Sequence, residues 1–206
     1  MKFNSEGNKR RMKKLFLHIC CAPCAEYPVQ YLRQEGYELM AYFYNPNIQP
    51  QKELDRRLEN VRIFSEKYKL PLHMDDQSAE TMWRNFKSDS KQDHCKVCYA
   101  LRMDNVAKKC KALGYEQFTT VLTVSPWQDH EEIKRAGEQA AKRHGVEFVY
   151  MDFRAGYREG QEMAKADGLY RQRYCGCIYS LGESNFKVKI AKQLALALED
   201  IPSRQA

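Results

Sequence analysis

The stretch LFLHICCAPC, residues 15–24, joins a short apolar run to three closely spaced cysteines. The run Leu15–Ile19 is too short for a helix and is typical of a strand that is buried within a sheet. The cysteines follow at once, where a strand of an α/β protein turns into a helix and where such proteins form their sites. The stretch therefore predicts the first strand of a sheet with a functional site at its end.

Predicted strands and helices alternate outward from this stretch. Further strands are predicted at Glu38–Tyr44, Leu70–Asp75, Gln117–Val124 and Val146–Phe153. Helices are predicted at Tyr27–Gln34, Gln51–Tyr68, Lys96–Leu113 and His130–His144, with a helix and polar loop at Ser78–Ser90. The segment Gly160–Ser180 starts as a helix, but glycines interrupt it. This alternation predicts an α/β fold with a doubly wound, mainly parallel sheet.

Length and composition fit one globular domain. The chain has 206 residues, 43% of them hydrophobic, which argues against a disordered chain. We expect a basic N-terminal tail at 1–13 and a single catalytic domain at 14–200. The net charge of +7 agrees with a nucleic-acid partner and equally with a basic solvated surface. No apolar run suits a membrane helix or a signal peptide, so we expect a cytoplasmic protein with no membrane partner.

The cysteines call for a chemical explanation. The cytosol keeps thiols reduced, so a disulfide framework is not expected for the eight cysteines. All but Cys110 fall into three tight clusters: Cys20, Cys21 and Cys24; Cys95 and Cys98; Cys175 and Cys177. Thiolates bind iron–sulfur clusters and zinc, and four of them saturate one centre. The excess predicts a second metal or cysteines with a redox role.

Simpler explanations of the cysteines remain open. A structural zinc site would use two of the pairs, and a thioredoxin-like disulfide centre would use Cys21 and Cys24. Each leaves other clustered cysteines without a role. Gly176, between Cys175 and Cys177, either lets two ligands converge on one centre or simply breaks a helix.

Several motifs together resemble the QueH family of epoxyqueuosine reductases. They are LHICCAPC at 17–24, Cys95-x-x-Cys98 and YRQRYCGC at 170–177, supported by YFYNPNI at 42–48 and LTVSP at 122–126. The resemblance covers roughly residues 14–182. It implies a sheet related to the adenine-nucleotide-hydrolase-like (HUP-like) folds, which carries a [4Fe–4S] cluster beside a second mononuclear metal, expected to be iron. It also implies tRNA with epoxyqueuosine at the wobble position as substrate, and an electron donor of the ferredoxin or flavodoxin type.

The resemblance also implies roles for individual residues. We assign the cluster to Cys20, Cys95, Cys98 and one of the last pair, here Cys175. The second metal is then held by Cys21, Cys24 and Cys177. Several family members carry Asp at the position of Cys24, so the softer thiolate leaves the identity of that metal open. Cys24 is thus a candidate catalytic residue, and His18 and Tyr174 are candidate proton donors, although His18 also suits a buried core position.

We expect tRNA to contact Arg171, Arg173, Tyr170 and Trp127 through phosphates and unstacked bases. Alternatively, the two arginines pair with nearby carboxylates such as Glu159 or Asp167. A tRNA-thiolating enzyme of the same broad fold would need a glycine-rich phosphate loop after the first strand, where this chain has Cys20–Cys24. A zinc-stabilised RNA-binding module without catalysis is the second alternative.

Overall fold

The fold is built on a five-stranded parallel sheet. The computed structural model describes residues 13–75, 86, 88, 90–196, 198 and 201. The strands are β1 (Lys13–Ile19), β2 (Tyr37–Phe43), β3 (Leu72–Met74), β4 (Gln117–Thr120) and β5 (Glu147–Phe148), in the order β3-β2-β1-β4-β5. Every strand pair is parallel. Residues 1–12 of the predicted tail and most of the predicted segment 78–90 lie outside the described residues.

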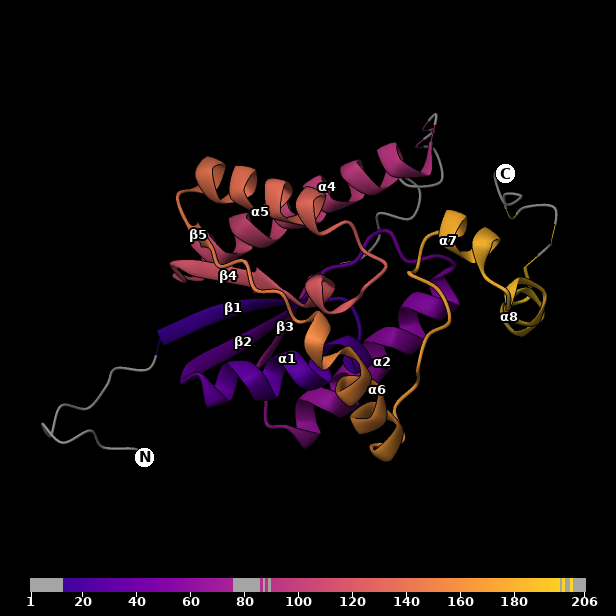
Figure 1. The fold of residues 1–206 in the computed structure, drawn as a ribbon, viewed down its shortest axis with the longest axis horizontal. Coiled ribbons are helices and arrows are strands. Elements are labelled where there is room, and N and C mark those ends of the chain that lie inside the picture. The colour runs from indigo at the N-terminus through magenta and orange to yellow at the C-terminus, as the bar shows by residue number, and fades with distance from the viewer. Residues whose placement is uncertain are drawn as a thin grey trace, which may run out of the picture.

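Helices cover both faces of the sheet, which confirms the predicted doubly wound α/β fold (Figure 1). The helices are α1 (Ala22–Gln34), α2 (Gln51–Lys67), α4 (Lys91–Ala112), α5 (His130–His144), α6 (Tyr157–Ala166), α7 (Ile178–Glu183) and α8 (Lys187–Leu194), with 3₁₀ turns η1 (Val121–Val124) and η2 (Arg154–Gly156). Helices α4 and α5 lie on one face, and α1, α2 and α6 lie on the other (Figure 1). Within the described parts of the chain, no helix has the length and apolar composition that a membrane span requires.

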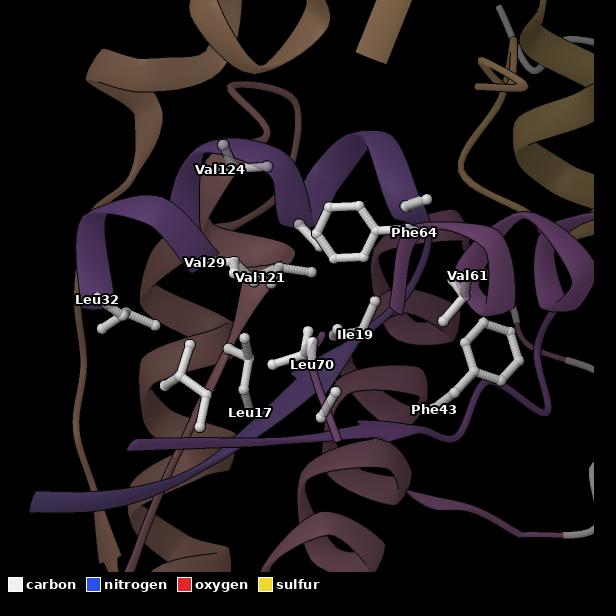
Figure 2. Packing of buried hydrophobic residues seen from close by; sticks show 14 of the residues in the cluster. Leu17, Ile19, Val29, Leu32, Phe43, Val61, Phe64, Leu70, Val121 and Val124 are labelled. Atoms are coloured by element: carbon white, nitrogen blue, oxygen red, sulfur yellow. The ribbon is translucent and has the colours of Figure 1, made fainter. Parts of the chain in front are cut away.

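Strand β1 supplies side chains to two cores, because successive residues of a strand point to opposite faces. Leu17 and Ile19 pack with residues of α1 and α2, such as Val29 and Phe64 (Figure 2). Phe16 belongs to the core formed with α4 and α5. The strand order reverses at β1, whose neighbours are β2 and β4, so the carboxyl ends of β1 and β4 flank the position where such sheets bind ligands.

Local capping explains the largest differences from the predicted elements. Helix α4 begins at Lys91 instead of Lys96, because the Ser90 side chain caps it by accepting a hydrogen bond from the Asp93 amide at 3.1 Å. Cys95 and Cys98 therefore lie one turn apart on a helix. Strand β4 ends at Thr120, whose hydroxyl accepts from the Leu122 amide and starts η1. The strand predicted at Val146–Phe153 is reduced to the two residues of β5.

Glu26, on α1, carries a buried carboxyl group that should make stability depend on pH. Burial raises its pKa from 4.5 to about 7, against the lowering effect of the Tyr68 hydroxyl. The native state then binds more protons than the unfolded chain between these pH values, so this contribution to stability is present below about pH 4.5 and is lost as pH rises through 7. We expect Glu26→Gln to exceed the parent protein in stability by about 1–3 kcal/mol at pH 8, with a smaller gain at pH 5.5. Urea denaturation at both pH values measures this, and equal stability at pH 8 would contradict it.

Candidate metal centre

Three cysteine sulfurs meet at the carboxyl end of β1. The Sγ atoms of Cys20, Cys21 and Cys24 all lie within 4.8 Å of one another. Cys20 directly follows β1, Cys21 is the N-cap of α1, and Cys24 is in its first turn. Thiolates that share one tetrahedral ion at about 2.3 Å lie about 3.8 Å apart. The trio therefore has the donor type and the spacing that a single soft metal ion requires.

The thiols of the trio differ in acidity. Burial raises the pKa of Cys21, but hydrogen bonds from Cys20 and Cys24 and the Arg57 guanidinium outweigh it and lower that pKa well below its usual value. The hydrogen bond to Cys21 raises the pKa of Cys20 to about 12. Hydrogen bonds to the other two thiols, together with burial, raise the pKa of Cys24. Of the three thiols, that of Cys21 therefore loses its proton most readily.

The other clustered cysteines gather beside the trio. Cys95, Cys175 and Cys177 line the same cavity as Cys20 and Cys24, which has a volume of about 570 Å³. Burial is the main reason why the pKa of the Cys98 thiol is raised. Cys175, Cys177 and Cys95 are close enough to raise it further. Among the described residues, no second set of three ligand atoms is as tight as the trio. A wider spacing suits ligands to separate irons of one cluster.

Helix α2 holds the loop that carries the last cysteine pair. The guanidinium of Arg57 donates from Nε to Glu53 at 2.8 Å, from Nη1 to the carbonyl of Cys175 at 2.8 Å and from Nη2 to that of Tyr174 at 3.0 Å. Asn60 exchanges two hydrogen bonds of 3.0 Å with the backbone of Tyr170. The loop is thus fixed from a rigid helix although it has no regular structure of its own.

Gly176 makes the turn between Cys175 and Cys177 possible. Its φ of +138° is one that side chains rarely adopt, and an added Cβ would lie 2.9 Å from Ile48 and 3.3 Å from Nη1 of Arg57. The amide of Gln49 donates to the Gly176 carbonyl at 2.8 Å. Gly176 thus bends a packed turn outside any helix, and the convergence of Cys175 and Cys177 on one centre stays a prediction.

Arg102 places a positive charge beside the cysteines. Its side chain is fully buried, and Nη1 donates a long hydrogen bond of 3.4 Å to Asn45. Its Nε and Nη2 are buried without a hydrogen-bond partner among the described residues. Burial works to lower its pKa, but Cys98, Cys175 and Cys20 outweigh burial and raise it. A buried cation of this kind requires a nearby anion, which a thiolate-ligated cluster would supply.

Polar side chains contact the sulfurs from the cavity wall. Nε2 of Gln172 donates to Sγ of Cys21 at 2.7 Å and lies 3.5 Å from Sγ of Cys24. Nε2 of Gln128 donates to Sγ of Cys175 at 3.4 Å. Tyr157 also lines the cavity, and burial followed by Cys24 and Cys21 raises the pKa of its hydroxyl. Hydrogen bonds to sulfur tune the electron density of metal-bound thiolates.

The two predicted proton donors have structural partners. His18 is fully buried, with Nδ1 2.8 Å from the Thr120 hydroxyl and Nε2 3.1 Å from the Tyr44 carbonyl. Burial, followed by Arg102, lowers its pKa to about 4. The hydroxyl of Tyr174 donates to the Gln49 carbonyl at 2.6 Å. Both arrangements favour structural roles, although Tyr174 also lines the cavity.

The predicted RNA-contacting residues surround the mouth of the site. Trp127 is 75% exposed and lines the cavity. The centroids of the Trp127 and Tyr157 rings lie 5.2 Å apart. Arg173 lines the cavity and a second groove, which Arg171 and Tyr170 also line. The alternative of ion pairs with Glu159 or Asp167 is not realised, because no ion pair of either arginine occurs among the described residues and Asp167 pairs with Lys67.

Sequence reasoning missed the two buried arginines, although their helical positions carry a signal. Arg57 falls within the apolar face of α2, between Leu54 and Val61. Arg102 likewise falls between Tyr99 and Val106 of α4. A charged residue in the apolar stripe of an amphipathic helix points into the fold, where it needs a partner. Gln172 and Tyr157 carry no comparable signal in the sequence.

Comparison with known proteins gives a consistent result. A family model described as epoxyqueuosine reductase QueH matches residues 15–183. A relative of that name from Dehalococcoides mccartyi is 36% identical over 167 residues, which cover 81% of this chain and 92% of the relative. Another from Thermotoga maritima is 32% identical over 185 residues, which cover 85% and 94%. A solved structure of a predicted tRNA methyltransferase subunit from Methanocaldococcus jannaschii is 11% identical, with a TM-score of 0.46 over 93% of this chain and 94% of that one.

Proposed function

The chain belongs to the epoxyqueuosine reductase QueH family of oxidoreductases, and from this we propose that it reduces epoxyqueuosine to queuosine in tRNA with a [4Fe–4S] cluster and an adjacent metal. The observation that carries the proposal is the convergence of three cysteine segments on one cavity beside the end of β1. A site with this many thiolates exceeds what one structural zinc ion takes up.

We propose that Cys20, Cys95, Cys98 and Cys175 hold the cluster, and that Cys21, Cys24 and Cys177 serve the second metal, expected to be iron. The side chain of Cys20 packs against the hydrophobic cores on both faces of the sheet, and its thiol lies near Arg102. Cys20 therefore suits a position between the two metal centres. The unpartnered nitrogens of Arg102 support a cluster, since four thiolates give it a net negative charge. Gln172 supports the second site by donating to Cys21 and Cys24.

The proposed reaction converts the epoxide of the cyclopentane ring to an alkene, and the oxygen leaves as water after uptake of two electrons and two protons. When bound, the cluster supplies electrons one at a time and the second metal acts as a Lewis acid. The electrons come from a donor of the ferredoxin or flavodoxin type. The chain itself provides the half-enclosed cavity, in which Trp127 offers a ring for a base that leaves the stack.

Tyr157 is our candidate for one proton donor. Tyr157 lines the cavity, and burial followed by the nearby Cys24 and Cys21 raises the pKa of its hydroxyl, so it stays protonated at neutral pH. We expect Tyr157→Phe to lower turnover by about 10²-fold, the lower end of the effect of general acid catalysis, while the metal content stays unchanged. Single-turnover rates with cluster spectra measure this. An unchanged rate would remove Tyr157 from the proton path.

A nucleoside assay tests the proposed function. Anaerobically purified protein with a chemical reductant and epoxyqueuosine-containing tRNA should yield queuosine, which mass spectrometry of the digested tRNA detects. The matched control is the same tRNA with unmodified guanosine at the wobble position, which should remain unchanged. A protein that carries zinc alone and leaves epoxyqueuosine intact would favour the non-catalytic RNA-binding module.

A further inference from the structure

A second groove adjoins the metal cavity. It has a volume of about 270 Å³ and is lined by Tyr170, Arg171, Arg173, Phe186, Lys189, Ile190 and Gln193. Arg173 and Phe186 line both this groove and the metal cavity, so the two lie side by side. A strand that places one nucleoside among the cysteines can therefore extend its neighbouring nucleotides into the groove.

The groove is basic and contains no acidic residue in its lining. Arg173 and Lys189 are exposed, and Arg171 is half-buried. None of the three cations forms an ion pair within the described parts of the chain. Unpaired cations that converge on a concave surface bind a polyanion more readily than an isolated surface charge does.

Two aromatic residues, Tyr170 and Phe186, line the groove together with these cations. The guanidinium carbon of Arg173 lies 4.9 Å from the centroid of the Phe186 ring, which is 42% exposed. The guanidinium carbon of Arg56 likewise lies 4.8 Å from the centroid of the Tyr170 ring. A groove that is lined by both cations and aromatic rings is typical of sites for single-stranded nucleic acid, in which the cations contact phosphates and the rings stack on bases.

Helix α8 supplies one wall of the groove. Lys189, Ile190 and Gln193 belong to it, and its residues Lys187–Leu194 lie beyond the match to the family model, which ends at 183. The helix is held by its own small core, in which Ile190 and Leu194 pack with Tyr174 of the cysteine-bearing loop. The position of Lys189 is therefore fixed relative to the metal site.

We propose that this groove binds the sugar–phosphate backbone of the anticodon loop beside the nucleoside in the metal cavity, with Lys189 of α8 as a phosphate contact. The inference rests on the proposed function, since it takes tRNA as the substrate. An acidic electron-donor protein is a different partner for a basic surface. The concave shape, the aromatic rings and the lining that the groove shares with the metal cavity favour the RNA strand.

Salt-dependent binding of unmodified tRNA to the anaerobically purified protein tests the groove. Lys189→Ala should weaken binding about five-fold near 0.15 M salt and reduce the slope of log affinity against log salt by about 0.7 to 0.9. Arg171→Ala should reduce the slope equally, and for modified and unmodified tRNA alike. The matched control is Lys192→Ala, an exposed lysine of α8 outside the groove, which should bind as the parent protein does.

The outcomes separate the groove from the function. Equal slopes for Lys189→Ala and Lys192→Ala, in a protein that does produce queuosine, would overturn the groove and leave the function standing. A reduced slope for Lys189→Ala in a protein that leaves epoxyqueuosine intact would support the groove and contradict the function. If a flavodoxin-type donor reduced the Lys189→Ala variant more slowly than the parent protein while tRNA binding stayed unchanged, the proposal would be overturned. The groove would then be assigned to the electron donor.

Discussion

Cys98→Ser is expected to abolish the proposed iron–sulfur cluster and the proposed activity together. Cys98 is 5% exposed on α4, and the thiols of Cys95, Cys175 and Cys177 act on its pKa. A serine hydroxyl stays protonated at neutral pH and is a poor ligand for iron, so one iron would lose its anchor. Loss of a residue that only hydrogen-bonds to a metal ligand already lowers metal affinity or activity by about 10–100-fold. We expect the loss of a ligand itself to lower the activity by more than about 100-fold. Visible absorption and single-turnover rates measure the two effects.

Cys110→Ser is the matched control, because Cys110 lies on the same helix and is also buried. Its thiol belongs to the apolar core and donates to the carbonyl of Tyr115 at 3.5 Å, a bond that a serine can keep. We expect the absorption spectrum and the rate of this variant to match those of the parent protein. A Cys98→Ser variant that keeps the cluster would show that Cys98 is not a ligand.

Cys24→Ser is expected to separate the two centres. Cys24 is part of the tight sulfur trio and lines the cavity, whereas the proposed cluster ligands do not include it. The variant should keep the cluster absorption, lose the second metal and lose turnover by more than about 100-fold. Metal analysis alongside single-turnover rates measures this, and full activity of Cys24→Ser would contradict the assignment.

The Cys24→Asp variant tests whether another ionised ligand can replace the thiolate of Cys24. Several members of the family are expected to carry Asp at this position, and a carboxylate is an ionised ligand that serine cannot replace. We therefore expect Cys24→Asp to bind the second metal and to recover part of the turnover lost in Cys24→Ser. Equal inactivity of both variants, with the second metal bound in Cys24→Asp, would show that the softness of the thiolate itself matters.

The fold could be predicted where local signals and packing agree. Helix α5 begins and ends as predicted at His130–His144, because Asp129 caps its start and Gly145 adopts the left-handed conformation after its end. β1 and α2 likewise match closely. Strand β5 is shorter than the predicted strand at 146–153, because only Glu147 and Phe148 pair with β4.

The ligands of the site could be predicted from the sequence, but the residues that hold those ligands in place could not. Clustered cysteines are visible in sequence spacing, because neighbouring ligands must reach one centre. The contacts of Arg57 with the backbone of Tyr174 and Cys175 join residues more than a hundred positions apart. Only the tertiary fold creates such contacts, and the same holds for Gln172 against Cys21. Helix α8 was not predicted, although it forms one wall of the second groove.

Metal and sulfide analysis of anaerobically purified protein, with electron paramagnetic resonance, tests for both proposed centres at once. We expect brown protein with about four sulfides, more than about four irons per chain, and a reducible [4Fe–4S] signal. The trio of Cys20, Cys21 and Cys24, next to Cys95, Cys98, Cys175 and Cys177, provides the ligands for both centres. Four irons and no other metal would remove the second centre, and zinc without iron or sulfide would contradict both centres and the proposed reaction.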